Sequence, residues 1–321
     1  MAFWGKKKRQ PPGLSCYGKL PATGDFIRLN AAGQENTTFD NWLGGSIHHA
    51  RESLGEAFDG CYQPALGLFL YRGDDGNGDE PDRGMVGAWA SSGDSAGRRY
   101  PMIVSTTYDY EELLAVGAAI PLATWSFLQS AYALCAGGRQ LPVDGFLGRV
   151  QQLQPVPLDP PEQSVASYRQ WTQTKTMRSF WETTLGDSSR RMAAVANVVA
   201  TLEIFAGQER PQTSLAIRFP TGAADFYAVS VWMDMTLRVA KWERTVLNAF
   251  WTPQHDLMVH IGPPQVQTFR ELIMDGSGAD HVTDLCRAPT MDEGQARGYL
   301  GARSEAVADL DQTIAAFLQR L

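Results

Sequence analysis

Two charged residues, Asp94 and Arg98, stand four positions apart in a short polar segment. Gly97 lies between them and favours a turn, and the segment leads into an apolar stretch that begins at Tyr100. A carboxylate and a guanidinium at this spacing can form a charge-assisted ion pair across the turn. We therefore predict an Asp94–Arg98 bridge, partly buried beneath a strand.

A second polar segment, residues 18–26, lies near the start of the chain. Gly24 permits a positive φ in a tight turn after Pro21, and Asp25 can accept hydrogen bonds from neighbouring backbone N–H groups. Phe26 would anchor the turn in the core. The residue types predict a tight turn anchored in the core.

These two segments admit two interpretations. In the first, each is a structural turn whose polar side chains satisfy the local backbone. In the second, Lys19, Asp25, Asp94 and Arg98 converge on one polar surface that a protein partner recognises. The sequence leaves both open.

Other polar clusters do not fit metal-binding patterns. The acidic run of residues 74–82 lacks the sixth-position glycine and twelfth-position glutamate of an EF-hand loop, so we predict a solvated loop. His48, His49 and Glu52 lack the i, i+4 histidine pair of a zincin, and we expect them to be exposed. The sequence predicts no metal site and no cofactor.

Motifs for covalent and nucleotide chemistry are also missing. The chain has no G-x-S-x-G elbow, no phosphate-binding loop and no catalytic cysteine signature. Its four cysteines are scattered without a C-x-x-C pair, which is typical of reduced thiols rather than a disulfide framework or a zinc ribbon. We predict a protein that is not an enzyme and that works in the cytoplasm.

Charge and hydropathy argue against nucleic acid as a partner and against insertion into a membrane. Lys and Arg total 28 against 35 Asp and Glu, and the net charge of −7 argues against nucleic-acid binding. Residues 1–14 contain four consecutive basic residues before two prolines and no apolar run, so we predict a flexible basic tail and no secretory signal. Residues 113–138 are uncharged, but Leu122, Trp125, Leu128 and Tyr132 recur at helical spacing, which favours a packed helix over an integral membrane segment.

Periodicity and turn residues predict the elements that position the two polar segments. An amphipathic helix is expected over 39–54, and strands over 66–72, 85–91 and 100–108 would form an antiparallel meander. The proline-rich residues 151–163 form a linker or surface loop between region 15–150 and region 164–321. In the second region we predict helices over 192–205, 227–239 and after Pro264, strands over 214–219, 246–251 and 257–261, and a C-terminal docking helix. Residues 227–239 also fit strand alternation, but thirteen residues would be long for a strand. The glycines at 294, 298 and 301 leave open two shorter helices at the C-terminus. Ser188 is the expected N-cap of the first of these helices, and Thr290 with Glu293 the expected capping box of the last.

A family resemblance rests on the two polar segments. Residues 18–26 match a G-K-x-P-x-x-G-D-F pattern, and residues 92–101 match S-x-D-x-x-G-R-x-[FY]-P. Both resemble signatures of the TagF/ImpM proteins associated with bacterial type VI secretion systems, and the W-L pair that begins at Trp42 lies between them as in that family. The matching positions are Gly18, Lys19, Pro21, Gly24, Asp25, Phe26, Trp42, Ser92, Asp94, Gly97, Arg98, Tyr100 and Pro101.

The resemblance implies both a fold and a function. The expected fold is α/β (α+β): a profilin- or longin-like antiparallel sheet covered by helices, followed by a second α/β segment with a C-terminal helix. The expected function is post-translational repression of a type VI secretion system through binding to its cytoplasmic forkhead-associated scaffold protein. Two alternatives remain open: an assembly factor of the secretion baseplate, and a phosphatase of the threonine-phosphorylation pathway.

Overall fold

The computed structural model describes residues 13–72, 83–155, 157–158, 161–222, 226–252, 256–274, 279–287 and 291–321. The predicted acidic loop lies outside the described residues. So does the predicted basic tail except for its last two positions, which already belong to the first strand.

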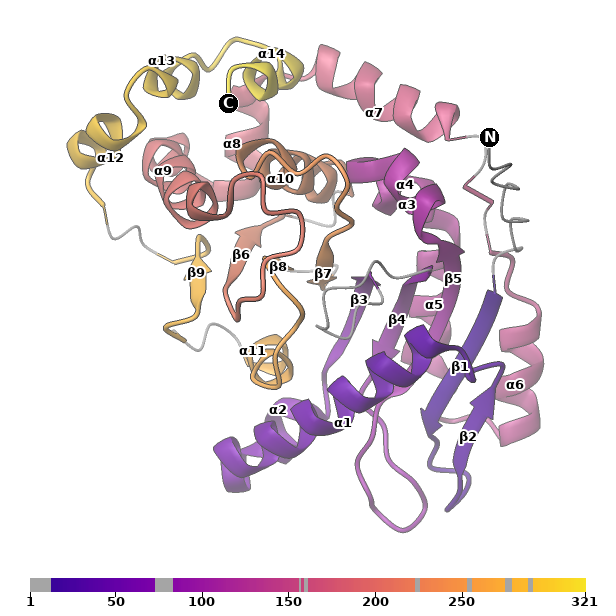
Figure 1. Ribbon diagram of the computed structural model, residues 1–321. Coiled ribbons are helices and arrows are strands. Elements are labelled where there is room, and N and C mark those ends of the chain that lie inside the picture. The colour runs from indigo at the N-terminus through magenta and orange to yellow at the C-terminus, as the bar shows by residue number, and fades with distance from the viewer. Residues whose placement is uncertain are drawn as a thin grey trace, which may run out of the picture.

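One sheet runs through the described residues in the order β2-β1-β5-β4-β3-β7-β8-β6-β9 (Figure 1). Neighbouring strands are antiparallel except β6 and β9, which are parallel. The predicted mixed α/β fold with a largely antiparallel sheet is confirmed. The strands are β1 (Gly13–Lys19), β2 (Phe26–Leu29), β3 (Leu66–Tyr71), β4 (Arg83–Ala90), β5 (Met102–Asp109), β6 (Ala216–Pro220), β7 (Asn248–Trp251), β8 (Asp256–His260) and β9 (Val282–Asp284).

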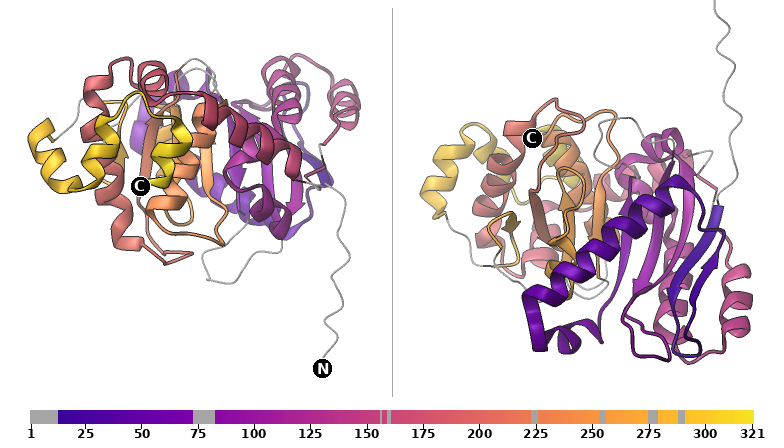
Figure 2. Two further views of the ribbon diagram at one scale, coloured as in Figure 1. Left: turned by 90° about the horizontal axis from the view of Figure 1, so that it is seen from above. Right: turned by 60° about the horizontal axis from the view of Figure 1, so that its bottom comes forward.

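Helices cover both faces of this sheet (Figure 2). Short 3₁₀ turns, η1 (Gly55–Ala57), η2 (Gly117–Ala119), η3 (Ser188–Arg190) and η4 (Glu203–Phe205), flank several of them. The α-helices are α1 (Gln34–Leu54), α2 (Phe58–Tyr62), α3 (Tyr110–Val116), α4 (Ile120–Ala123), α5 (Trp125–Gly138), α6 (Val143–Gln151), α7 (Glu162–Thr174), α8 (Met177–Leu185), α9 (Arg191–Leu202), α10 (Phe226–Val239), α11 (Thr268–Ile273), α12 (Glu293–Leu300), α13 (Arg303–Ala308) and α14 (Ile314–Gln319).

The central strands are buried on both faces, which explains their continuous apolar sequences. In β3, Leu68 and Leu70 join the larger core with α5 and α10, whereas Phe69 and Tyr71 join the smaller core under α1 and α11. Phe39 of α1 stacks on Phe69 with ring centroids 4.6 Å apart. The smaller core holds α1 across the face of the sheet.

Most predicted elements are present. The meander of β3, β4 and β5 is confirmed, as are the hairpin of β7 and β8, strand β6 and the helix over 227–239. The helix over 39–54 begins earlier, at Gln34. The uncharged stretch is broken into α3, η2, α4 and α5, and Leu128 is fully buried in the larger core.

Several predicted helix ends are wrong. Asp187, not Ser188, provides the side-chain cap, accepting from the backbone N–H of Ser189 at the start of η3. The capping box of α12 joins Asp292 to Gln295; Thr290 lies outside the described residues. The expected C-terminal docking helix is three short helices, because Gly301 at φ 56° ends α12 and the chain turns again before α14.

The two predicted regions share one sheet. Strand β3 of the first region pairs with β7 of the second, with Leu68 opposite Trp251 and Leu70 opposite Ala249. The division at residues 151–163 stays a prediction about independent folding, and it does not coincide with an edge of the sheet.

No single helix within the described ranges is long and apolar enough to span a bilayer. One pair of helical segments bent by 56°, residues 110–123 with 125–138, has a sufficient length and composition. This pair contains the uncharged stretch for which the sequence predicts a packed helix.

Titratable residues are buried in the second half of the sheet. His260 is 1% exposed, and neither ring nitrogen has a hydrogen-bond partner among the described residues. Burial, reinforced by the neighbouring His281 and Arg72, lowers the pKa of His260 to about 3. Burial also raises the pKa of the Glu271 carboxyl, and the charges of Arg270 and His281 oppose this rise.

We expect acid to destabilise the fold through His260. The pKa of His260 is lower in the folded chain than in the unfolded chain, so below about pH 6.5 the unfolded chain binds one more proton at this residue. The free energy of unfolding therefore falls as the pH falls, by up to about 1.4 kcal/mol per pH unit. His260→Phe keeps an aromatic ring edge-on to Phe250, whose centroid lies 5.8 Å away, and should flatten the dependence between pH 6.5 and 4. Urea unfolding at several pH values measures this.

Glu271→Gln is the matched control for this prediction. The pKa of Glu271 is raised in the folded chain, so this residue stabilises the fold as the pH falls and offsets part of the His260 effect. Removing the Glu271 carboxyl should therefore make the free energy of unfolding fall more steeply with decreasing pH. Equal slopes in the wild type and His260→Phe would contradict the prediction.

Candidate functional site

The first polar segment connects β1 to β2 in a hairpin at one end of the sheet. The backbone N–H of Thr23 donates to the Leu20 carbonyl at 3.2 Å, and that of Asp25 donates to Thr23 Oγ1 at 3.1 Å. Gly24 does not adopt the predicted positive φ. The turn already closes at Thr23, so Gly24 needs no left-handed conformation.

The second polar segment connects β4 to β5 at the same end of the sheet. Asp94 Oδ1 accepts from the backbone N–H groups of Ala96 at 3.0 Å and Arg98 at 2.8 Å. Gly97 has φ 81° and donates its N–H to the Asp94 carbonyl at 3.0 Å. The predicted turn at Gly97 is confirmed, and its glycine adopts a left-handed conformation.

The two segments meet at the Asp94 carboxylate. Its Oδ2 lies 2.6 Å from Arg98 Nε and 2.5 Å from Lys19 Nζ. Arg98 Nη2 also donates to the Gly24 carbonyl at 2.6 Å, which ties the two turns together. We call Lys19, Gly24, Asp94 and Arg98 the signature cluster.

Three of the four charged residues converge, and recognition of this surface by a partner stays a prediction. Lys19, Asp94 and Arg98 come together, and the predicted Asp94–Arg98 pair is confirmed. Asp25 is exposed, and its carboxylate makes none of the bonds of the cluster.

Burial differs sharply within the signature cluster. The side chains of Asp94, Lys19 and Arg98 are 0%, 12% and 63% exposed. The hydrogen bond from Lys19 holds the pKa of the Asp94 carboxyl far below its usual range; burial opposes this, and the bonds from Arg98 add to it. The carboxylate is therefore a permanently charged anchor, and the Arg98 guanidinium is the part that faces solvent.

Close backbone contact explains Gly18. Gly18 has φ 134°, and a Cβ at this position would stand 2.1 Å from the Pro101 carbonyl oxygen and 2.8 Å from Met102 Cα. Only glycine permits this approach of β1 to the start of β5. The contact fixes the first polar segment against the second.

Aromatic residues hold the two polar segments and α1 in place. Phe26 packs edge-on against Tyr100 with centroids 5.1 Å apart, and the Tyr100 hydroxyl donates to the Asp40 carboxylate of α1. Trp42, also on α1, donates its indole N–H to the Gln265 carbonyl at 2.9 Å. Phe26 thus anchors its turn, as predicted, although it remains partly exposed.

Sequence reasoning missed two supporting residues. The Tyr62 hydroxyl donates to the Ser92 carbonyl at 2.9 Å and accepts from the Ser92 N–H at 3.1 Å, so it holds the entry of the second turn. Asp40 accepts from Tyr100. Both partners are distant in the sequence, and no local spacing indicates them.

The predicted exposure of the histidine cluster holds for His48 and Glu52, which form an exposed i, i+4 pair at 3.3 Å. His49 is half-buried. No group of three or more His, Cys, Asp or Glu side chains suited to a metal ion occurs in the part of the chain that the structure describes.

The signature cluster presents a rigid polar surface. Asp94 has its two oxygens saturated by four donors and a depressed pKa, which does not suit proton transfer near neutral pH. Arg98 uses Nε and Nη2 internally, and its exposed guanidinium retains further donors in a fixed orientation. Such a group suits planar recognition of an acidic or carbonyl-bearing partner.

Comparisons with known proteins identify the region that holds this cluster. No curated protein matches the chain. A partly similar solved structure is the crystal structure of PA0076 from Pseudomonas aeruginosa PAO1, at 22% identity over 45% of this chain and 64% of that one. The match thus spans less than two thirds of PA0076, with a TM-score of 0.39.

The family comparison is specific. Residues 15–153 match the model of the TagF N-terminal domain, described as type VI secretion system-associated. That range contains both polar segments and the helix α1 between them. It also contains the strands β1 to β5, except for the first two residues of β1. Residues 15–153 are therefore assigned to the TagF N-terminal domain, which is type VI secretion system-associated.

Proposed function

We propose that this protein restrains a bacterial type VI secretion system after translation, from the cytoplasm, by stoichiometric binding to a component of that system. The proposed partner is the forkhead-associated scaffold protein. Binding, rather than catalysis, is the proposed mode of action.

One observation carries the proposal. Two turns that are distant in the sequence are locked together around Asp94, and the result is an exposed Arg98 held at both Nε and Nη2. A long side chain that is already ordered loses little conformational entropy when a partner binds. The exposed residues around it, Pro21, Asp25 and Gly97, widen the contact surface.

Deletion of the gene in the native host should increase the amount of secreted tube protein, because a stoichiometric restraint is lost. Transcript levels of the secretion genes should stay unchanged. Immunoblots of culture supernatants and quantitative transcript measurements test this.

Complementation supplies the controls. The wild-type chain should restore the restraint, as should Asp59→Ala, which removes an exposed ion pair with Arg99 near the same turn. Reduced secretion after deletion would instead support the baseplate assembly factor.

A further inference from the structure

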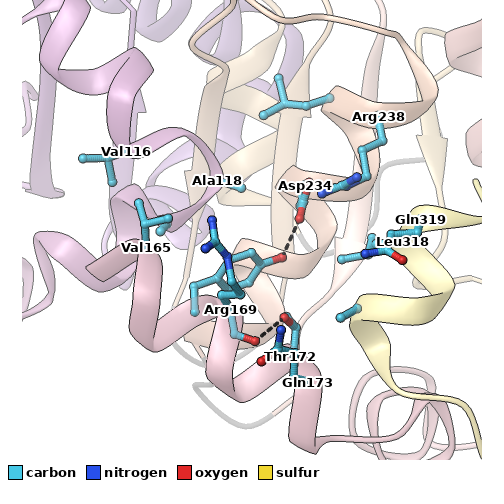
Figure 3. A pocket seen from close by; sticks show the side chains of 14 residues that line it. Val116, Ala118, Val165, Arg169, Thr172, Gln173, Asp234, Arg238, Leu318 and Gln319 are labelled. Atoms are coloured by element: carbon cyan, nitrogen blue, oxygen red, sulfur yellow. Dashed lines mark hydrogen bonds and ion pairs between the residues drawn. The ribbon is translucent and has the colours of Figure 1, made fainter. Parts of the chain in front are cut away.

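A pocket lies where α3 and η2 meet three helices of the second region (Figure 3). These helices lie at the end of the sheet away from the β1–β2 hairpin (Figure 1). Its volume is about 310 Å³. This is the lower end of the range for small-molecule sites. The lining comes from the end of α3 and from η2, and from α7, α10 and α14, so the pocket depends on both halves of the chain.

The polar side of the pocket is built around Asp234. Its Oδ2 accepts from the Tyr168 hydroxyl at 3.0 Å, and its Oδ1 accepts from Arg238 Nε at 2.7 Å. Tyr168 is 9% exposed and Asp234 has a side chain 14% exposed, so this hydrogen-bonded group is fixed. The Tyr168–Asp234 bond joins α7 to α10, and Figure 3 shows Asp234 beside Arg238 at the pocket.

Two guanidinium groups line the pocket around this single carboxylate. Arg238 uses only Nε in its bond to Asp234, and its side chain is 45% exposed. Arg169 on α7 also lines the pocket, and its guanidinium has no acidic partner within the described ranges. The lining therefore carries one net positive charge in a chain whose net charge is −7.

The remaining walls are apolar. Val116, Val165, Leu237 and Leu318 surround the polar group and come from four different elements. A ligand that fills the pocket must accept hydrogen bonds from guanidinium at one end and tolerate aliphatic walls at the other. It must also be small, because the volume equals roughly ten water molecules.

We propose that this pocket binds a small organic monocarboxylate with a compact apolar tail. The carboxylate is held by Arg169 and Arg238, and the tail packs against the aliphatic walls. The single net positive charge of the lining neutralises one carboxylate, whereas a phosphate dianion would leave one negative charge uncompensated beside Asp234. The proposal is independent of the proposed function, because no residue of the signature cluster takes part.

Titration of the full-length protein with hexanoate, followed by amide NMR, tests the pocket. We expect saturable shifts at Ala118, Leu237 and Ala315. Acetate lacks the tail and 1-hexanol lacks the charge. Each should therefore bind at least about tenfold more weakly than hexanoate. Hexyl phosphate should also bind more weakly than hexanoate at pH 8.

Arg169→Gln should weaken hexanoate binding about tenfold, because one charge-assisted hydrogen bond is lost while the exposed site leaves folding intact. Arg149→Gln on α6 is the matched control: this arginine is also exposed and also on a helix, but lies outside the pocket, and binding should be unchanged. Equal binding of hexanoate and 1-hexanol, shifts confined to other surfaces, or an unaffected Arg169→Gln variant would overturn the proposal.

Discussion

Replacing Asp94 by alanine is expected to lower the melting temperature by roughly 5 to 10 °C. The substitution leaves the largely buried Lys19 ammonium without its anion. It also removes the acceptor of the Ala96 and Arg98 backbone N–H groups, which the turn cannot replace. Thermal unfolding followed by circular dichroism measures the loss.

A second substitution tests whether the unpaired lysine is the cause. Combining Asp94→Ala with Lys19→Met removes the stranded charge, so the double variant should be more stable than the sum of the two single losses predicts. Asp59→Ala removes an exposed carboxylate that pairs with Arg99 at 3.0 Å, and it should shift the melting temperature by no more than about 2 °C. Similar losses for Asp94→Ala and Asp59→Ala would contradict the anchoring role.

Arg98 should separate stability from recognition. Its side chain is mostly exposed, so Arg98→Ala should change the melting temperature only slightly but weaken binding to the proposed partner, the forkhead-associated scaffold protein, about tenfold. Exchanging the charges by Asp94→Arg with Arg98→Asp should not restore stability, because the new arginine would face Lys19. Recovery of the melting temperature in the exchanged variant would show that Lys19 is not a true partner.

Gly18→Ala is expected to destabilise the protein by roughly 3 to 5 kcal/mol and to reduce soluble expression. Its φ of 134° disfavours any side chain, and the added Cβ overlaps the backbone at Pro101 and Met102 rather than a movable side chain. Such a loss is a large share of a typical total of about 5 to 15 kcal/mol. Urea unfolding of purified protein gives the value.

Gly148→Ala in α6 is the matched substitution. A Cβ at this position meets nothing within 4 Å, and alanine favours helix, so stability should stay equal or rise by up to about 1 kcal/mol. If Gly18→Ala unfolded at the same urea concentration as the wild type, the close approach of β1 to β5 would not be a constraint on folding.

Local patterns predicted the fold better than its connections. The strands of the meander were predictable because burial on both faces produces continuous apolar runs, as in residues 66–71. The ends of helices were less predictable, because competing caps such as Asp187 and Asp292 stand one or two positions from the expected ones. The extension of one sheet into the second region depends on β3 meeting β7, and no sequence signal marks that pairing.

The candidate site divides in the same way. The Asp94–Arg98 pair lies within one turn, so its spacing was sufficient to predict it. Lys19 lies 75 positions from Asp94 and reaches it only because β1 pairs with β5 in a particular register. Residue type and family resemblance placed Lys19 among the candidates, but only the register explains its contact.

The pairing of β3 with β7 also has a consequence for biosynthesis. During translation, β3 leaves the ribosome roughly 180 residues before β7, which corresponds to about 10 to 35 s at common elongation rates. Through that interval the backbone of Leu68, Phe69 and Leu70 has no strand on the side that β7 later occupies. An apolar strand with a free edge is the form most open to pairing with another chain. The nascent protein must therefore be protected until its second half is synthesised, either by a chaperone or because it meets other chains too slowly to pair with them.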